Sequence, residues 1–137
     1  MISVIIPTYN EEEHITETVQ KLWQHDESNL IKEIIITDGG STDNTITIAK
    51  MVGVKIVSSP NKGRAAQMNY GASFATEKIL YFLHADTIPP RNFTKDIARA
   101  IGKGFTTGCF ILSFDYDHWF LKANCWFTRF DIDAFRF

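Results

Sequence analysis

The side chains of His84 and Asp86 are the first candidates for chemistry, because they directly follow an apolar run, residues 79–83. Such a run is typical of a buried strand in a parallel sheet. In open α/β sheets, ligands bind beyond the carboxyl ends of the strands. Strand alternation directs residues 84 and 86 to one side, with the small Ala85 between them. An imidazole and a carboxylate there predict a metal or nucleotide ligand, and the alternative is an ordinary polar strand end.

Two further loops carry groups that suit the same ligand. Asp38 ends another apolar run and precedes two glycines, which let the backbone approach a ligand. Its carboxylate can accept hydrogen bonds from a nucleobase N–H or from ribose hydroxyls, and the alternative is an Asp-Gly turn. Lys62 and Arg64 stand before a predicted helix, where cations and a helix N-terminus together suit a diphosphate. Together these groups predict a nucleotide-diphosphate ligand with a divalent cation.

The elements that must position these residues follow from hydrophobic periodicity. Apolar runs predict strands over residues 2–6, 33–37, 54–57 and 79–83. Helices are expected after them, ending near residues 24 and 52, then over 64–75 and 91–100. Asn10 and Glu13 have the spacing of a capping box, and Gly53 is a candidate helix C-cap. Four βα units in succession predict a three-layer α/β/α fold, mostly parallel, with helices on both faces.

The C-terminal part follows a different pattern. Residues 104–114 are expected to form a further strand, antiparallel at an edge of the sheet. Residues 118–137 are rich in aromatic side chains and carry a few basic ones. The usual interpretation is a helix packed on its own domain. The sharper interpretation is a surface that meets a membrane, a lipid-linked acceptor or another subunit.

Composition excludes several classes of protein. A length of 137 residues fits one domain with a sizeable core. The net charge of -2 gives no electrostatic case for nucleic acid as a partner. No apolar run reaches the roughly eighteen residues of a transmembrane helix, and residues 1–6 enter a strand rather than a signal peptide. Cys109 and Cys125 lack the spacing of a metal site and are expected to be reduced and buried.

Known nucleotide-binding and hydrolase motifs are missing. No G-x-G-x-x-G follows the first predicted strand, which disfavours a nicotinamide-binding Rossmann domain. The sequence also lacks the G-x-x-x-x-G-K-[ST] motif of P-loop kinases and GTPases and the G-x-S-x-G nucleophile elbow.

Four motifs occur in order along the chain, namely Ser3-Val-Ile-Ile-Pro-Thr-Tyr-Asn-Glu11, Asp38-Gly-Gly-Ser-Thr-Asp-Asn-Thr45, Asn61-Lys-Gly-Arg-Ala-Ala-Gln-Met-Asn69 and His84-Ala-Asp-Thr87. In order and approximate spacing they resemble the family 2 glycosyltransferases of GT-A fold. The last form is similar to that of a bacterial subgroup of small enzymes. The resemblance covers residues 1 to about 115 and implies a nucleotide-sugar-binding GT-A domain there. Residues 116–137 would then be a tail of the same domain or the start of an acceptor-binding region.

The resemblance implies inverting transfer of a sugar, commonly from a UDP-sugar, with Mg²⁺ or Mn²⁺. Base and ribose would contact Pro7, Tyr9 and Glu11, and the base would also contact Asp38. The nucleotide and its phosphates would border Lys62, Gly63 and Arg64. Asp86 would match the metal carboxylate of the family's Asp-x-Asp motif. The acceptor stays open, as a lipid-linked, saccharide or small-molecule hydroxyl, and we expect a cytoplasmic protein, peripheral at the inner face of the membrane.

The chain departs from the family pattern in two ways. His84 replaces the first acid of Asp-x-Asp, which removes an oxygen ligand that Mg²⁺ prefers, although imidazole can still bind the nucleotide or a metal. Family members also continue into an acceptor half that supplies the catalytic base, and here only Asp131 and Asp133 are weak candidates. An alternative is therefore a catalytically silent or truncated nucleotide-sugar-binding module. A nucleotidyltransferase ranks last, because its glycine-rich signature differs from Pro7-Thr-Tyr-Asn10.

Overall fold

The computed structural model describes residues 1–110 of the chain, and the predicted roles of Asp131, Asp133 and the aromatic stretch 118–137 lie outside them. Residues 1–99 form one compact unit, and residues 100–137 fall in a second unit. Each is described by itself.

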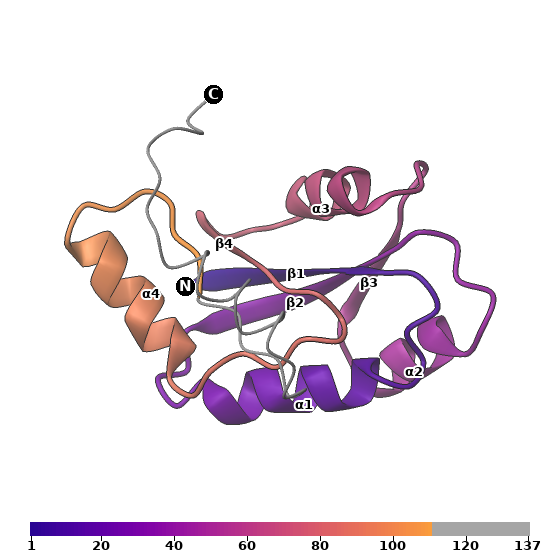
Figure 1. The fold of residues 1–137 in the computed structure, drawn as a ribbon, viewed down its shortest axis with the longest axis horizontal. Coiled ribbons are helices and arrows are strands. Elements are labelled where there is room, and N and C mark those ends of the chain that lie inside the picture. The colour runs from indigo at the N-terminus through magenta and orange to yellow at the C-terminus, as the bar shows by residue number, and fades with distance from the viewer. Residues whose placement is uncertain (111–137) are drawn as a thin grey trace, which may run out of the picture. The chain divides into compact units, whose positions relative to one another are not determined.

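A parallel sheet with the strand order β3-β2-β1-β4 forms the centre of the first unit (Figure 1). Its strands are β1 (Ile2–Thr8), β2 (Ile31–Asp38), β3 (Lys55–Ser58) and β4 (Ile79–Phe82). β1 is buried along its whole length, and β2 is buried from Ile34 onward, because helices cover both faces. Long runs of isoleucine and valine suit strands that contact apolar neighbours on both faces.

Helices cover both faces of this sheet, as the sequence predicts. α3 (Arg64–Ala72) packs on β1 and β2 from one side, whereas α1 (Ile15–His25) and α2 (Thr45–Met51) lie on the other (Figure 1). α4 (Phe93–Gly102) follows β4, and Phe93 at its start lies 5.0 Å from Tyr81 between ring centroids. The predicted three-layer α/β/α fold is confirmed.

Glycine sets the close approach of α3 to the sheet. A Cβ at Gly71 would overlap Thr37 Oγ1 and lie 2.8 Å from Ile5 Cγ2. Only a residue without a side chain therefore fits between this helix and the two central strands.

β4 differs from the central, buried strand that its apolar run predicts. It pairs with β1 alone within the described residues, so it forms an edge of the described sheet. Burial alternates along it, and Leu80 and Phe82 are 38% and 39% exposed. A short apolar run does not distinguish a central strand from an edge strand, because both need apolar contacts on at least one face.

The start of α1 differs from the capping pattern read in the sequence. Asn10 has φ 56 and hydrogen bonds to the loop after β2, so it does not cap α1, which begins at Ile15. At the start of α2, the carboxylate of Asp43 accepts a hydrogen bond from the N–H of Thr45, the first residue of the helix. Gly53 follows α2 with φ 73, as expected of a residue after a helix C-cap.

The described part of the second unit, residues 100–110, contains the end of α4 and a turn closed by the Phe105 N–H to Ala100 O bond. The strand predicted over 104–114 is wrong for residues 104–110, and residues 111–114 lie outside the described range. Cys109 is an exposed free thiol rather than a buried one. Among residues 1–110, no helix is long and apolar enough to cross a membrane.

Candidate active site

A cleft of about 410 Å³ opens at the carboxyl ends of the parallel strands. Its lining comes from the segments after β1, β2 and β4 and from the start of α3, and consists of Pro7, Thr8, Tyr9, Glu11, Gly39, Lys62, Gly63, Arg64, Gln67, His84, Ala85 and Asp86. The paired registers of β1 with β2 and of β2 with β3 bring these strands to an end at one edge. The structure therefore brings together every predicted site residue of the described chain except Asp38.

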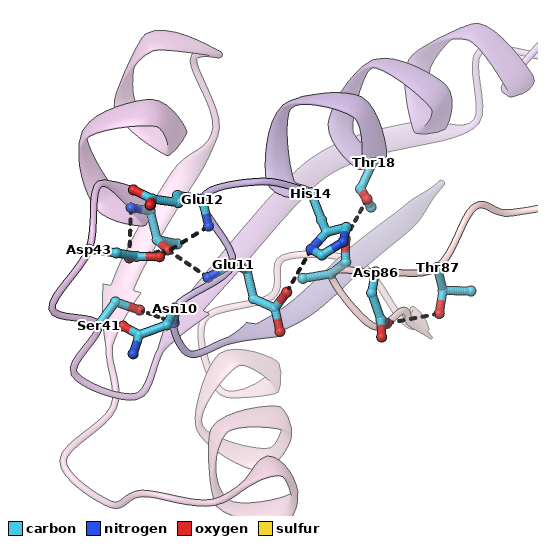
Figure 2. Close-up of polar contacts among 11 residues, drawn as sticks. Asn10, Glu11, Glu12, His14, Thr18, Ser41, Asp43, Asp86 and Thr87 are labelled. Carbon is cyan, nitrogen blue, oxygen red and sulfur yellow. Dashed lines mark hydrogen bonds and ion pairs between the residues drawn. The ribbon is translucent and has the colours of Figure 1, made fainter.

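The loops after β1 and β2 are held together by hydrogen bonds (Figure 2). The Asn10 N–H donates to Ser41 Oγ at 2.9 Å, and the Glu11 N–H donates to Thr45 Oγ1 at 2.8 Å. The Glu12 N–H donates to Asp43 Oδ2 at 3.2 Å. Successive backbone N–H groups of the loop after β1 thus donate to side chains of the loop after β2 and of the first residue of α2. These bonds fix the backbone that carries the Glu11 side chain at the cleft.

The carboxylate of Asp43 accepts hydrogen bonds from the loop after β1 and from the start of α2. Desolvation raises its pKa, but the Thr45 hydroxyl, the Thr45 N–H and the Glu12 N–H outweigh this effect and lower the pKa below its ordinary value of 3.8. The group is therefore an anion at neutral pH, and it accepts hydrogen bonds on both oxygens.

Asp38 lies at the same edge of the sheet but does not line the cleft. It is 4% exposed, and its carboxylate accepts hydrogen bonds from the Gly40 N–H at 2.8 Å and from the Ser41 N–H at 3.1 Å. The Ser41 hydroxyl also donates to it. These bonds shape the turn after β2. The contact of Asp38 with a base stays a prediction.

The cationic side of the cleft precedes α3. Gly63 has φ 112, a conformation that favours glycine, and Arg64 begins the helix. Lys62 Nζ lies 5.7 Å from the ring centroid of Tyr9, so the ammonium and the aromatic ring border the same space. A helix N-terminus with two adjacent cations suits the oxygens of a diphosphate.

The segment after β4 places His84 and Asp86 on the lining, and the buried Ala85 lies between them. The Thr87 N–H donates to His84 O at 3.1 Å, and the Thr18 hydroxyl of α1 donates to Ala85 O. Asp86 is exposed, and its Oδ1 accepts a hydrogen bond from the Thr87 hydroxyl at 3.3 Å (Figure 2). The loop therefore presents one carboxylate and one imidazole to the cleft.

A divalent cation at this site needs ligands beyond those that residues 1–110 supply. Within residues 1–110, no three His, Cys, Asp or Glu side chains are grouped to hold a metal ion. Mg²⁺ and similar ions in phosphate-transfer sites commonly bind one or two carboxylates plus substrate phosphates and waters. Asp86, with His84 beside it, is consistent with such a site, in which a bound diphosphate completes the coordination.

Sequence reasoning did not single out Thr8, Gly39, Gln67 or Ala85 as site residues, although all of them line the cleft. Thr8 and Ala85 lie within the quoted motifs, next to residues that were singled out. Gln67 lies one turn into α3, and its 4% exposure in a helix of small residues is the signal that only the structure provides.

The fold and the cleft define a GT-A-type domain, since the sheet is parallel, helices cover both faces and the polar cleft lies at the strand ends. The sequence pattern of the family described as "Glycosyl transferase family 2" matches residues 3–133. The chain belongs to this family.

Curated relatives support this assignment. A dolichyl N-acetyl-alpha-D-glucosaminyl phosphate 3-beta-D-2,3-diacetamido-2,3-dideoxy-beta-D-glucuronosyltransferase of Methanococcus voltae is 30% identical over 102 residues, which are 69% of this chain and 32% of the relative. The glycosyltransferase GlyG of Streptococcus pneumoniae is 33% identical over 107 residues, which are 74% of this chain and 35% of the relative. The chain thus spans about a third of the length of these relatives.

Solved structures show the same fold. S. aureus TarS 1-349 in complex with UDP has a TM-score of 0.66 and 28% identity, covering 74% of this chain and 32% of that chain. Glucosyl-3-phosphoglycerate synthase from Mycobacterium tuberculosis, in complex with Mn²⁺, UDP and phosphoglyceric acid, has a TM-score of 0.62 and 25% identity. That similarity covers 77% of this chain and 39% of the synthase.

Proposed function

We propose that this chain is the donor-binding part of a glycosyltransferase that takes a sugar from a nucleotide-diphosphate sugar, with UDP as the nucleotide. The observation that carries the proposal is the single cleft bordered by Tyr9 and Glu11, by Lys62 and Arg64, and by Asp86. Membership of glycosyl transferase family 2 supports the reaction class. TarS, a structure of which is in complex with UDP-GlcNAc, supports the nucleotide sugar as donor.

In this proposal each border of the cleft contacts a different part of the donor. The base and ribose contact Pro7, Tyr9 and Glu11, and Asp38 contacts the base or supports the loop that does. Lys62, Gly63 and Arg64 border the diphosphate, because two cations and a helix N-terminus favour its negative charge. The Glu11 carboxylate, 29% exposed and 3.3 Å from His14 Nδ1, is held at the rim where ribose hydroxyls can donate to it (Figure 2).

The proposed metal ligand is Asp86, with His84 as a second ligand or as a contact to the ribose. A bound divalent ion would stabilise the negative charge that develops on the leaving diphosphate. Because His84 supplies nitrogen where the related motif has a carboxylate, we propose weaker Mg²⁺ binding, with Mn²⁺ tolerated or preferred. We also propose that the chain belongs to a subgroup of small bacterial enzymes that have this His-Ala-Asp-Thr form.

Transfer with inversion also needs a base that takes the proton of the acceptor hydroxyl. Asp131 and Asp133 are the weak candidates, and they lie outside the described residues. The acceptor, the position at the inner face of the membrane and the contact of residues 118–137 with lipid or another subunit are proposals of the same kind.

A thermal-shift titration of UDP and UDP-sugars, with and without Mn²⁺, tests the donor site. We expect UDP to raise the melting temperature, and Mn²⁺ to increase the shift because the metal joins Asp86 to the diphosphate. Asp86→Ala should remove the metal-dependent part of the shift and leave the metal-free part. Asp96→Ala, an exposed carboxylate of α4 paired with Arg99, is the matched control. An unchanged metal response in Asp86→Ala would refute the ligand assignment.

A second candidate function is a nucleotide-sugar-binding module without transferase activity. The observation that favours it is that every contact assigned to the cleft is with the donor, and none within residues 1–110 is with an acceptor. Sugar release from a UDP-sugar separates the two, since tight UDP binding with no release favours the module.

A further inference from the structure

The amide of Gln67 is a buried polar group in the cleft. The residue is 4% exposed, yet it lines the cleft beside Gly39. Its Nε2 donates to Thr8 O at 2.6 Å and to Thr37 O at 2.9 Å. The side chain thereby joins β1 and β2 at their carboxyl ends.

These two bonds determine which way the amide faces. Both partners are carbonyl oxygens, which only accept, so the nitrogen rather than the oxygen must face them. Both amide hydrogens are then used within the protein. Oε1, which only accepts, is the one polar atom of the side chain left for a ligand.

Oε1 is free to receive a donor. Within residues 1–110, the hydrogen bonds of Gln67 account for its nitrogen only. Among residues 1–110, Thr37 Oγ1 is the one side-chain polar atom that is fully buried and has no hydrogen-bond partner. Gln67 Oε1 also has no partner there, so it must retain some contact with solvent in the cleft. An acceptor held in one orientation by two hydrogen bonds loses little conformational freedom when a ligand binds.

Gly39 leaves the space that this amide occupies. A Cβ at position 39 would lie 2.9 Å from Gln67 Nε2, 3.0 Å from Cδ and 3.2 Å from Oε1. The amide of Gln67 therefore fills the space that a side chain at position 39, on the turn after β2, would occupy.

We propose that Gln67 Oε1 is a specificity determinant, accepting a hydrogen bond from the nucleoside of the donor. The group it takes is an uncharged donor, either the imide N–H of a uracil-type base or a ribose hydroxyl. A ligand that presents an acceptor at this point is rejected, because two oxygens would face each other in a buried place. The inference rests on the proposed nucleotide-sugar site and adds the residue that selects within it.

Calorimetric titration of four nucleotides, UDP and three analogues, into the full chain tests this inference. UDP is compared with N3-methyl-UDP, which lacks the imide N–H, and with 2′-deoxy- and 3′-deoxy-UDP, which each lack one ribose hydroxyl. The wild-type chain should bind one of these analogues roughly tenfold or more weakly than UDP, because a buried acceptor is left without a donor. Gln67→Ala should bring that ratio close to one, and the analogue affected identifies base or ribose as the partner.

Two variants keep the test decisive. Gln67→Lys retains a donor for the carbonyls of Thr8 and Thr37 but has no acceptor, so it should also abolish the discrimination if Gln67→Ala fails to fold. Its added charge acts on every nucleotide alike and cancels in the ratio. Ser73→Ala, which removes a hydroxyl bonded to Tyr70 O beyond the end of α3, is the control and should keep the wild-type ratio.

The negative outcomes are distinct. If UDP binds but Gln67→Ala weakens UDP and all analogues by the same factor, Gln67 only ties the strands and the inference is overturned. The same holds if the wild-type chain does not discriminate among the nucleotides. If the wild-type chain does not bind UDP at all, the proposed function fails and the inference falls with it.

Discussion

At the scale of single residues, the packing of α3 beside the cleft depends on two glycines, Gly39 on the turn after β2 and Gly71 within the helix. Gly39 leaves room for the Gln67 amide, and Gly71 lets the helix approach Thr37 and Ile5 of the sheet. Neither requirement comes from the backbone conformation, since positive φ values occur elsewhere, at Gly40 and Gly63. Both are packing requirements, and protein interiors tolerate even one extra methyl group poorly.

Gly71→Ala should therefore destabilise the chain. The added methyl would overlap the Thr37 side chain and push α3 away from the sheet, at a cost of about 1–3 kcal/mol. Chemical denaturation measures the change in the free energy of unfolding. Gly102→Ala is the control, because nothing lies within 4 Å of a Cβ there, and it should leave stability unchanged or slightly raised. Equal losses in both variants would contradict the packing argument.

At the scale of elements, the buried carboxylate of Asp26 joins the end of α1 to β2 and α4. It accepts hydrogen bonds from the Leu30 N–H at 3.0 Å, the Ile31 N–H at 2.8 Å and the Thr94 hydroxyl at 2.7 Å. Asp26 is 5% exposed, so water does not readily replace it as an acceptor. This junction lies at the end of the sheet opposite the cleft, because β2 begins there and the cleft lies where it ends.

Asp26→Ala should lower the free energy of unfolding by about 3 kcal/mol, because it leaves buried donors without an acceptor. Urea denaturation followed by circular dichroism gives the value. Asp96→Ala, whose 48%-exposed carboxylate pairs with Arg99 on the surface, should cost less than about 1 kcal/mol. The assigned role of Asp26 would be wrong if the two variants lost similar stability.

At the scale of the whole molecule, Glu33 couples stability to pH. Its carboxylate accepts hydrogen bonds from Ser3, from the N–H and hydroxyl of Thr76, and lies 3.7 Å from Lys55 Nζ. These residues come from β1, from the segment before β4 and from β3, so one group joins three parts of the chain to β2. Burial raises the pKa of Glu33, but Thr76, Ser3 and Lys55 outweigh it and lower the pKa below its ordinary value of 4.5.

Acid should therefore weaken the fold through Glu33. Because the folded-state pKa is lowered, the stabilisation is present above the unfolded value near 4.5 and is lost as the pH falls through the folded-state pKa. Unfolding free energies measured from pH 7 to pH 3 should fall less steeply in Glu33→Gln than in the wild-type chain. Glu27→Gln, at an exposed position, should follow the wild-type curve. Parallel curves for all three proteins would refute this coupling.

Much of the fold was predictable from local patterns. Isoleucine-rich runs indicate the strands because a strand covered on both faces needs apolar side chains throughout, and helical spacing indicates the helices between them. The errors concern properties that local patterns do not encode, such as the position of a strand within its sheet. The run at 79–83 predicts a strand but not its position at an edge of the sheet that residues 1–110 form. The apolar residues after Gly104 predict a strand that residues 104–110 do not form.

By itself, the sequence determined the order of the elements, the parallel sheet and the edge at which the ligand loops emerge, because these follow from periodicity and from the handedness of βα units. The residues named from the four motifs lie at that edge. Only the tertiary structure decided which of their polar atoms are available. It shows the Asp38 carboxylate bonded to its own turn and both amide hydrogens of Gln67 bonded to β1 and β2. The bonds of Gln67 join segments far apart in the chain, so they depend on packing that sequence spacing does not encode.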